Sequence, residues 1–148
     1  MVIVLDACVA TKLFVAESQS AAAARLVARY PLLLAPELVA LEVTSAITRK
    51  VRNRELDRPA AERALDSWWE FLSLGNVRLT PDRALLTDAA ARSLALGHPL
   101  ADCLYLTLAA RHNVPLVTAD EPFRDAVRDT FPEIHLLSEL GTENRLVE

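Results

Sequence analysis

Four acidic residues stand out in this sequence by their positions: Asp6, Glu42, Asp102 and Asp120. Asp6 and Asp120 each close a short apolar run, at residues 2–5 and 116–119. Short runs of Val, Ile and Leu are typical of strands that are buried on both faces of a parallel sheet. Because ligands bind beyond the carboxyl ends of such strands, these two aspartates are expected where α/β folds keep their chemistry.

The other two acids lie on expected helices. Glu42 belongs to a stripe of apolar and small residues on a helix over 36–50, and Asp102 lies in the first turn of a helix over 100–112. Acids are seldom buried without a partner, which makes Glu42 informative. Asp102 has a simpler explanation beside the functional one, because an acid in the first helical turn gains about 0.3–1 kcal/mol from the helix dipole.

A shared site for the four acids would consist of oxygen ligands alone. Such sites select Mg²⁺ or Mn²⁺ over zinc or copper. These metals lower the pKa of bound water and stabilise charge on a phosphodiester that is attacked in line. The spacing of the acids does not establish that they converge, so at this point the metal site is a hypothesis.

The rest of the chain alternates short apolar runs with amphipathic helices. No repeat, low-complexity tract or linker interrupts it, so we expect one three-layer α/β domain over residues 1–140 and a polar tail over 141–148. Strands are expected at 2–5, 32–35, 77–79, 116–120 and 134–137, with Pro36 opening one helix and Thr80 capping another over 81–96. The two tryptophans, Trp68 and Trp69, are interpreted as core or interface anchors.

The composition and charge of the chain limit the kinds of partner that it can bind. The chain has 148 residues, a net charge of −4 and a 52% hydrophobic content. The negative net charge taken alone argues against nucleic-acid binding. The net charge, however, averages over a cluster of basic residues, here called the basic band. This band either lines a cleft that binds a phosphate backbone or is the solvated end of a helix. This band comprises Arg49, Lys50, Arg52, Arg54, Arg58 and Arg63.

Two cysteines, Cys8 and Cys103, do not make a disulfide framework. No apolar stretch is long enough to indicate a transmembrane helix, and the N-terminus lacks the pattern of a signal peptide. We therefore expect a cytoplasmic protein without membrane attachment. His98 and His112 have no His or Cys partner at ligand spacing, so they are interpreted as a loop or capping residue and a helix-end cation.

Four segments, in order and at matching spacings, resemble the motifs of PIN-domain ribonucleases, and most closely those of the VapC toxins of type II toxin–antitoxin systems. Each segment is weak alone, but the four together are specific and cover nearly the whole chain. The segments are residues 4–9 with Lys12 and Phe14, residues 35–43, residues 101–109 and residues 116–120.

The resemblance implies a parallel sheet of four to five strands in the order 3-2-1-4-5, and a Mg²⁺- or Mn²⁺-dependent endoribonuclease. Asp6 and Asp102 resemble the main metal ligands, and Glu42 and Asp120 the remaining acids, which bind a second metal or orient the attacking water. Thr118 is similarly placed to hydrogen-bond a metal ligand. The implied partners are RNA, a VapB-like antitoxin and a second copy of the chain.

One residue departs from the family pattern, because Cys8 stands where the family usually has Ser or Thr. A thiol is a poorer hydrogen-bond donor and a softer ligand than a hydroxyl. Cys8 is either a small buried apolar residue or a residue that shifts metal preference toward Mn²⁺ or makes activity sensitive to oxidation. The candidate substrate contacts are Lys12, Arg49, Lys50 and Arg52, although Lys12 on its own also fits a solvated cation.

Two other functions remain open at this stage. A nuclease of the same fold without an antitoxin would process RNA or act on DNA, and a neighbouring gene for an antitoxin would distinguish the two. A binding module that no longer cleaves is the third interpretation, to which Cys8 gives slight support. The presence of all four acids argues against such a loss of activity.

Overall fold

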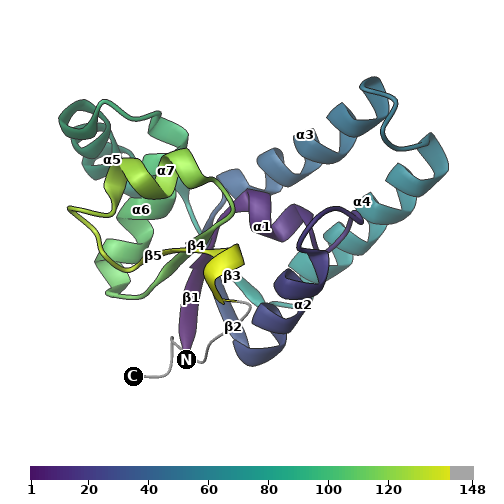
Figure 1. Ribbon diagram of the computed structural model, residues 1–148, viewed down its shortest axis with the longest axis horizontal. Coiled ribbons are helices and arrows are strands. Elements are labelled where there is room, and N and C mark those ends of the chain that lie inside the picture. The colour runs from purple at the N-terminus through teal and green to yellow at the C-terminus, as the bar shows by residue number, and fades with distance from the viewer. Residues whose placement is uncertain (141–148) are drawn as a thin grey trace.

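The computed structural model describes residues 1–140, and the sequence tail 141–148 lies outside the described residues (Figure 1). The described chain contains five strands and eight helices. In chain order they are β1 (Val2–Leu5), α1 (Ala7–Thr11), α2 (Ser20–Arg29), β2 (Leu32–Pro36), α3 (Leu38–Arg52), α4 (Arg58–Ser73), β3 (Val77–Thr80), α5 (Asp82–Leu96), α6 (Leu100–His112), β4 (Leu116–Thr118), α7 (Glu121–Val127), β5 (Ile134–Leu136) and α8 (Leu137–Leu140).

The strands form a single parallel sheet in the order β3-β2-β1-β4-β5, which confirms the predicted order. The chain moves outward from β1 to β3, then crosses to the other side of β1 and continues through β4 to β5. The order therefore reverses between β1 and β4, where Leu5 pairs with Val117. This is the position at which open parallel sheets bind their ligands.

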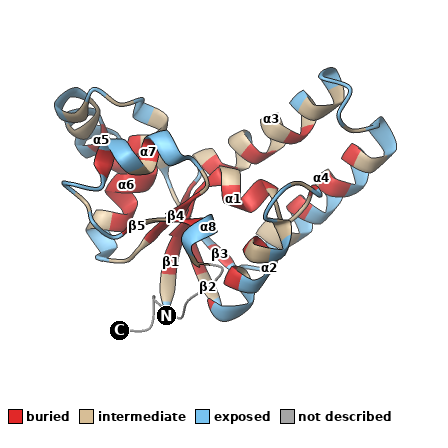
Figure 2. Cartoon of the chain, viewed as in Figure 1, coloured by how far each residue is buried: buried red, intermediate tan, exposed pale blue. Residues whose placement is uncertain are grey.

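Right-handed crossovers explain the two helical layers. Connections that move in opposite directions along the sheet place their helices on opposite faces, so α1–α4 lie on one side and α5–α7 on the other (Figure 1). Helices α3 and α4 pack together and extend beyond the sheet as an arm (Figure 1). Strands β1, β2 and β4 and helix α6 are the most buried parts of the described chain, whereas the end of the arm is exposed (Figure 2).

Several element ends differ from the prediction. Pro36 is the last residue of β2, and α3 begins at Leu38. Thr80 ends β3 instead of capping α5, whose N-cap position is Pro81. In both places the parallel ladder continues, because Pro36 pairs with Thr80. Pairing between β2 and β3 thus decides boundaries that local propensity assigned to the helices.

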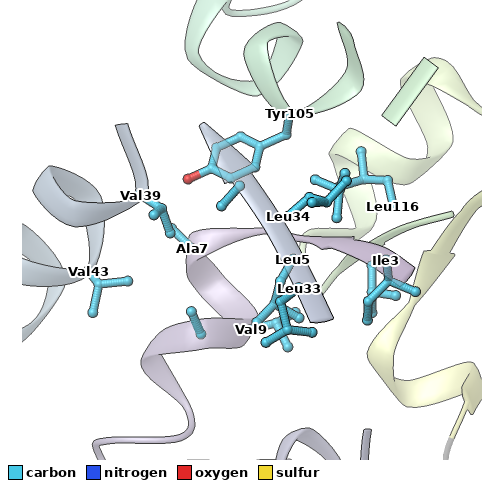
Figure 3. Packing of buried hydrophobic residues seen from close by; sticks show 14 of the residues in the cluster. Ile3, Leu5, Ala7, Val9, Leu33, Leu34, Val39, Val43, Tyr105 and Leu116 are labelled. Atoms are coloured by element: carbon cyan, nitrogen blue, oxygen red, sulfur yellow. The ribbon is translucent and has the colours of Figure 1, made fainter. Parts of the chain in front are cut away.

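Apolar side chains from both layers fill the core around β1 (Figure 3). Helix α6 is buried along most of its length, and its Tyr105 reaches across the core toward Val39 (Figure 3). Trp68 is fully buried against Phe14 and Phe71, as expected of a core anchor. Trp69 remains 46% exposed. Of the described helices, none combines the length and apolar character needed to span a bilayer.

Candidate active site

The four acids predicted from the sequence line one cleft of about 520 Å³. They come from four separate places: the end of β1, the second turn of α3, the first turn of α6, and the turn after β4. The cleft lies where strand order reverses, so topology alone brings β1 and β4 to it. Residues far apart in the sequence thus share one pocket.

Asp6 is the most buried of the four acids, with 6% of its surface exposed. Thr118 Oγ1 donates a hydrogen bond to Asp6 Oδ2 over 2.7 Å, and Cys8 Sγ donates to the same oxygen over 3.3 Å. Burial raises the pKa of Asp6 to about 6, and the neighbouring charges of Asp102 and Glu42 add to this rise against the two hydrogen bonds. Among residues 1–140, no cationic side chain forms an ion pair with Asp6.

Cys8 and Thr118 form a small network under Asp6. Cys8 Sγ and Thr118 Oγ1 are 3.4 Å apart, the Ala119 N–H donates to Cys8 Sγ over 3.2 Å, and the Asp120 N–H donates to Thr118 Oγ1 over 3.0 Å. Burial and the charge of Asp6 raise the pKa of the Cys8 thiol far above its ordinary value. Cys8 is therefore a protonated donor to Asp6, not a reactive thiolate.

Glu42 and Asp102 each have an aromatic hydrogen-bond partner. Tyr105 donates from its hydroxyl to Glu42 Oε1 over 2.7 Å. His98 Nε2 lies 2.7 Å from Asp102 Oδ2, and an ionised carboxylate can only accept, so the imidazole donates. Burial raises the pKa of both acids despite these contacts, and the charges of neighbouring carboxylates contribute to the rise.

The interpretation of His98 as a plain loop or capping residue is therefore incomplete. The His98 ring stacks on Phe123 at a centroid distance of 5.0 Å, and its carbonyl accepts a hydrogen bond from Ser93. His98 is thus fixed while it contacts Asp102. The four-residue spacing between them was visible in the sequence, but the break at Pro99 concealed that they face each other.

Asp120 is the most exposed of the four acids. Its Oδ1 accepts the Phe123 N–H over 3.0 Å, so it also caps α7. One oxygen is thus engaged in the fold, and a carboxylate keeps further acceptor capacity for a ligand.

The predicted basic residues separate into two groups. Arg49 lines the acidic cleft, and Lys12 and Lys50 line an adjoining cleft that also includes Arg49. Lys12 is not a solvated cation, because its Nζ contacts Glu17 at 3.2 Å and its side chain is only 11% exposed. Arg52 is exposed and lines neither of these two clefts.

The donor chemistry of the acidic cleft fits a hard divalent cation. The four acids supply oxygen only, and burial, followed by the charges of Asp102 and Glu42, raises the pKa of Asp6. Within residues 1–140, however, no three His, Cys, Asp or Glu side chains form a ready-made ligand set.

Comparison with known proteins agrees with this geometry. The sequence profile of the PIN domain matches residues 3–128. The chain belongs to the PIN domain family. It is also 31% identical over 120 residues to ribonuclease VapC3 of Pyrobaculum aerophilum, covering 81% of this chain and 90% of that protein. The predicted VapC-type PIN family is thereby confirmed.

Two solved structures share the PIN fold of this chain. A toxin–antitoxin complex from Klebsiella pneumoniae superposes with a TM-score of 0.63 and 13% identity, covering 91% of this chain and 97% of that chain. The sarcin–ricin-loop-cleaving toxin VapC20 of Mycobacterium tuberculosis gives a TM-score of 0.62 and 16% identity, covering 84% and 94%. At these identities, the likeness shows the fold alone.

Proposed function

We propose that this VapC-type PIN protein is an endoribonuclease toxin that hydrolyses RNA phosphodiester bonds with Mg²⁺ or Mn²⁺. The observation that carries the proposal is the convergence of Asp6, Glu42, Asp102 and Asp120 on one cleft at the switch point of the sheet. The relative from Pyrobaculum aerophilum, named a ribonuclease, supports RNA as the substrate class.

Each acid has a distinct part in this proposal. Asp6 and Asp102 would hold the metal directly, and Glu42 and Asp120 would bind a second ion or orient the attacking water. A bound divalent ion lowers the pKa of water and stabilises the charge that develops on the phosphate. Thr118 and Cys8 fix one oxygen of Asp6, which leaves the other oxygen for the ion.

Substrate contacts beyond the acids are proposed for Lys12, Arg49, Lys50 and Arg52. Arg49 has the strongest support, since it is exposed and lines the acidic cleft itself. Cations next to a carboxylate cluster offset its repulsion of RNA, even though the whole chain carries a net charge of −4.

We further propose a VapB-like antitoxin and a second copy of the chain as partners, in the cytoplasm, where both free cysteines stay reduced. The antitoxin is supported by the structural likeness to a toxin–antitoxin complex. Exposed apolar side chains on α5 and α6 provide a surface for self-association. They are Leu86, Leu94 and Leu100.

Cleavage of a defined single-stranded RNA by the purified protein tests the proposed function. We expect cleavage with Mg²⁺ or Mn²⁺ and no cleavage with EDTA. Asp6→Asn and Asp102→Asn should each lose about a hundredfold or more of the rate, the scale seen when one group that stabilises transition-state charge is removed. Asp66→Asn is the matched control, because Asp66 is exposed on α4 outside the cleft. Cleavage that persists in EDTA or in Asp102→Asn would contradict the proposal.

A further inference from the structure

A second cleft of about 420 Å³ adjoins the acidic cleft. It lies between α1, the segment of residues 12–19 and the C-terminal half of α3. The two clefts are continuous, since both include the same stretch of lining. The shared residues are Cys8, Thr11, Ala46, Arg49 and Asp120.

Two lysines in the second cleft are held by one carboxylate. Glu17 Oε1 lies 3.2 Å from Lys12 Nζ, and Glu17 Oε2 lies 2.9 Å from Lys50 Nζ. The lysine side chains are only 11% and 21% exposed, although long cations ordinarily reach water. Each oxygen of Glu17 thus serves one ammonium group, as two oxygens of a phosphate would.

The charges of the cleft lining balance. Lys12, Arg49 and Lys50 supply three positive charges, and three acids, Glu17, Glu55 and Asp120, supply three negative ones. Although burial acts to raise the pKa of Glu17, its contacts with Lys50 and Lys12 hold that pKa below the usual range, so it is ionised at neutral pH. Without the Glu17 carboxylate the lining would carry one net positive charge.

The Glu17 side chain can leave without dismantling the segment that carries it. The Glu17 N–H donates to Ser20 Oγ over 3.1 Å, and Ser20 Oγ donates to the Val15 carbonyl over 3.2 Å. Lys12 Nζ keeps a second acceptor in the Ser18 carbonyl at 2.9 Å. Lys50 Nζ likewise keeps a contact with Glu55 Oε2 at 3.5 Å. Rotation of the Glu17 side chain therefore opens one acceptor position on each ammonium group while the backbone hydrogen bonds of the segment remain.

We propose that the second cleft binds a backbone phosphate of the RNA flanking the cleaved bond, and that Glu17 occupies the place of that phosphate in the free protein. The inference rests on the proposed ribonuclease function, because it takes its ligand to be the same RNA strand. The phosphate displaces Glu17 from Lys12 and Lys50, and Arg49 lies where the two clefts join.

RNA binding by Glu17→Gln tests this inference, measured by fluorescence anisotropy with a short single-stranded RNA in EDTA over a series of NaCl concentrations. We expect several-fold tighter binding than in the wild type, because the phosphate no longer has to displace a carboxylate. The log–log salt slope should stay about the same, since the same phosphate is neutralised in both proteins. Glu62→Gln is the matched control, because Glu62 is an exposed, ion-paired acid on α4 outside both clefts. It should bind as the wild type does.

Further variants keep the result interpretable. Lys12→Met and Lys50→Met should bind RNA more weakly, and Lys12→Met should abolish the gain in a Glu17→Gln background. Equal or weaker binding by Glu17→Gln, with an unchanged unfolding midpoint, would overturn the inference, as would an equal gain in Glu62→Gln. RNA cleavage by the wild type with Mn²⁺ is measured separately. If the wild type cleaves RNA but Glu17→Gln does not bind RNA more tightly, this inference is refuted and the proposed ribonuclease function is not.

Discussion

At the scale of single residues, the candidate site depends on how its carboxylates are held. Asp6 and Asp102 each use one oxygen for a fixed partner, Thr118 and His98 respectively. Partners of this kind orient the ligands of a metal, and their loss typically lowers metal affinity by ~10–100-fold. We therefore propose that His98 is a positioning residue that acts through Asp102.

Replacement of His98 tests that assignment. His98→Ala should weaken Mn²⁺ binding about tenfold or more, measured by calorimetry, because Asp102 loses its donor. His98→Gln should recover part of the affinity, since its amide nitrogen reaches about as far as Nε2. His112→Ala, at the exposed end of α6, is the control. Unchanged Mn²⁺ affinity in His98→Ala would remove the positioning function.

Cys8 gives a second prediction at this scale. Its thiol is protonated and donates to Asp6, which a serine hydroxyl also does. Cys8→Ser should therefore retain cleavage with an unchanged ratio of Mn²⁺ to Mg²⁺ activity, and the wild type should resist peroxide because little thiolate is present. A ratio that moves toward Mg²⁺ in Cys8→Ser would show instead that sulfur contacts the metal.

At the scale of elements, long-range hydrogen bonds fix the helices that carry the acids. Asp82 Oδ1, in the first turn of α5, accepts the Leu38 N–H over 3.0 Å and so caps α3, the helix of Glu42. No residue at the start of α3 provides that cap itself. The first turn of α3 thus depends on a residue 44 positions away.

Loss of that cap has a measurable cost. Asp82→Ala should lower the free energy of unfolding by about 1 kcal/mol, the usual value of a helix N-cap, whereas Asp82→Asn should retain most of the stability because asparagine also caps well. Urea unfolding followed by circular dichroism gives both values. Equal losses in the two variants would show that the charge of Asp82, and not its capping oxygen, is what matters.

The positions of the strands could be predicted from the sequence, whereas two element boundaries and the long-range contacts could not. Apolar runs identified all five strands, and the family resemblance supplied their order. Propensity could not decide whether Pro36 and Thr80 belong to strands or helices, since pairing between β2 and β3 decided it. Two contacts connect segments that are far apart in the sequence, so no local sequence pattern predicts them. They are the contacts of Asp82 with Leu38 and of Glu17 with Lys50.

At the scale of the whole molecule, the acidic cleft makes the ionised form of Asp6 unfavourable. Burial raises the pKa of Asp6 to about 6 from an ordinary value of 3.8, so the folded chain binds its proton more tightly than the unfolded chain does. The stability that this proton contributes is complete below about pH 4 and is lost as pH rises through 6. A difference of about two pKa units corresponds to roughly 3 kcal/mol.

Thermal unfolding in EDTA checks this dependence. The midpoint of the wild type should fall between pH 5 and pH 7, and the fall should be smaller in Asp6→Asn, in which residue 6 does not titrate. Mg²⁺ or Mn²⁺ at pH 7 should raise the wild-type midpoint, because a ligand that binds only the folded state stabilises it. A pH profile identical in both proteins would show that Asp6 carries no such excess charge.

We propose that the four carboxylates, which come from separate elements, together hold a hard divalent ion. Calorimetric titration of Mn²⁺ into the wild type, Asp102→Asn and the control Asp66→Asn, at pH 7.5, tests it most directly. Mn²⁺ should bind saturably to the wild type and to Asp66→Asn, and its binding to Asp102→Asn should be strongly weakened or lost. Absence of saturable binding in the wild type, or equal affinity in all three proteins, would contradict it.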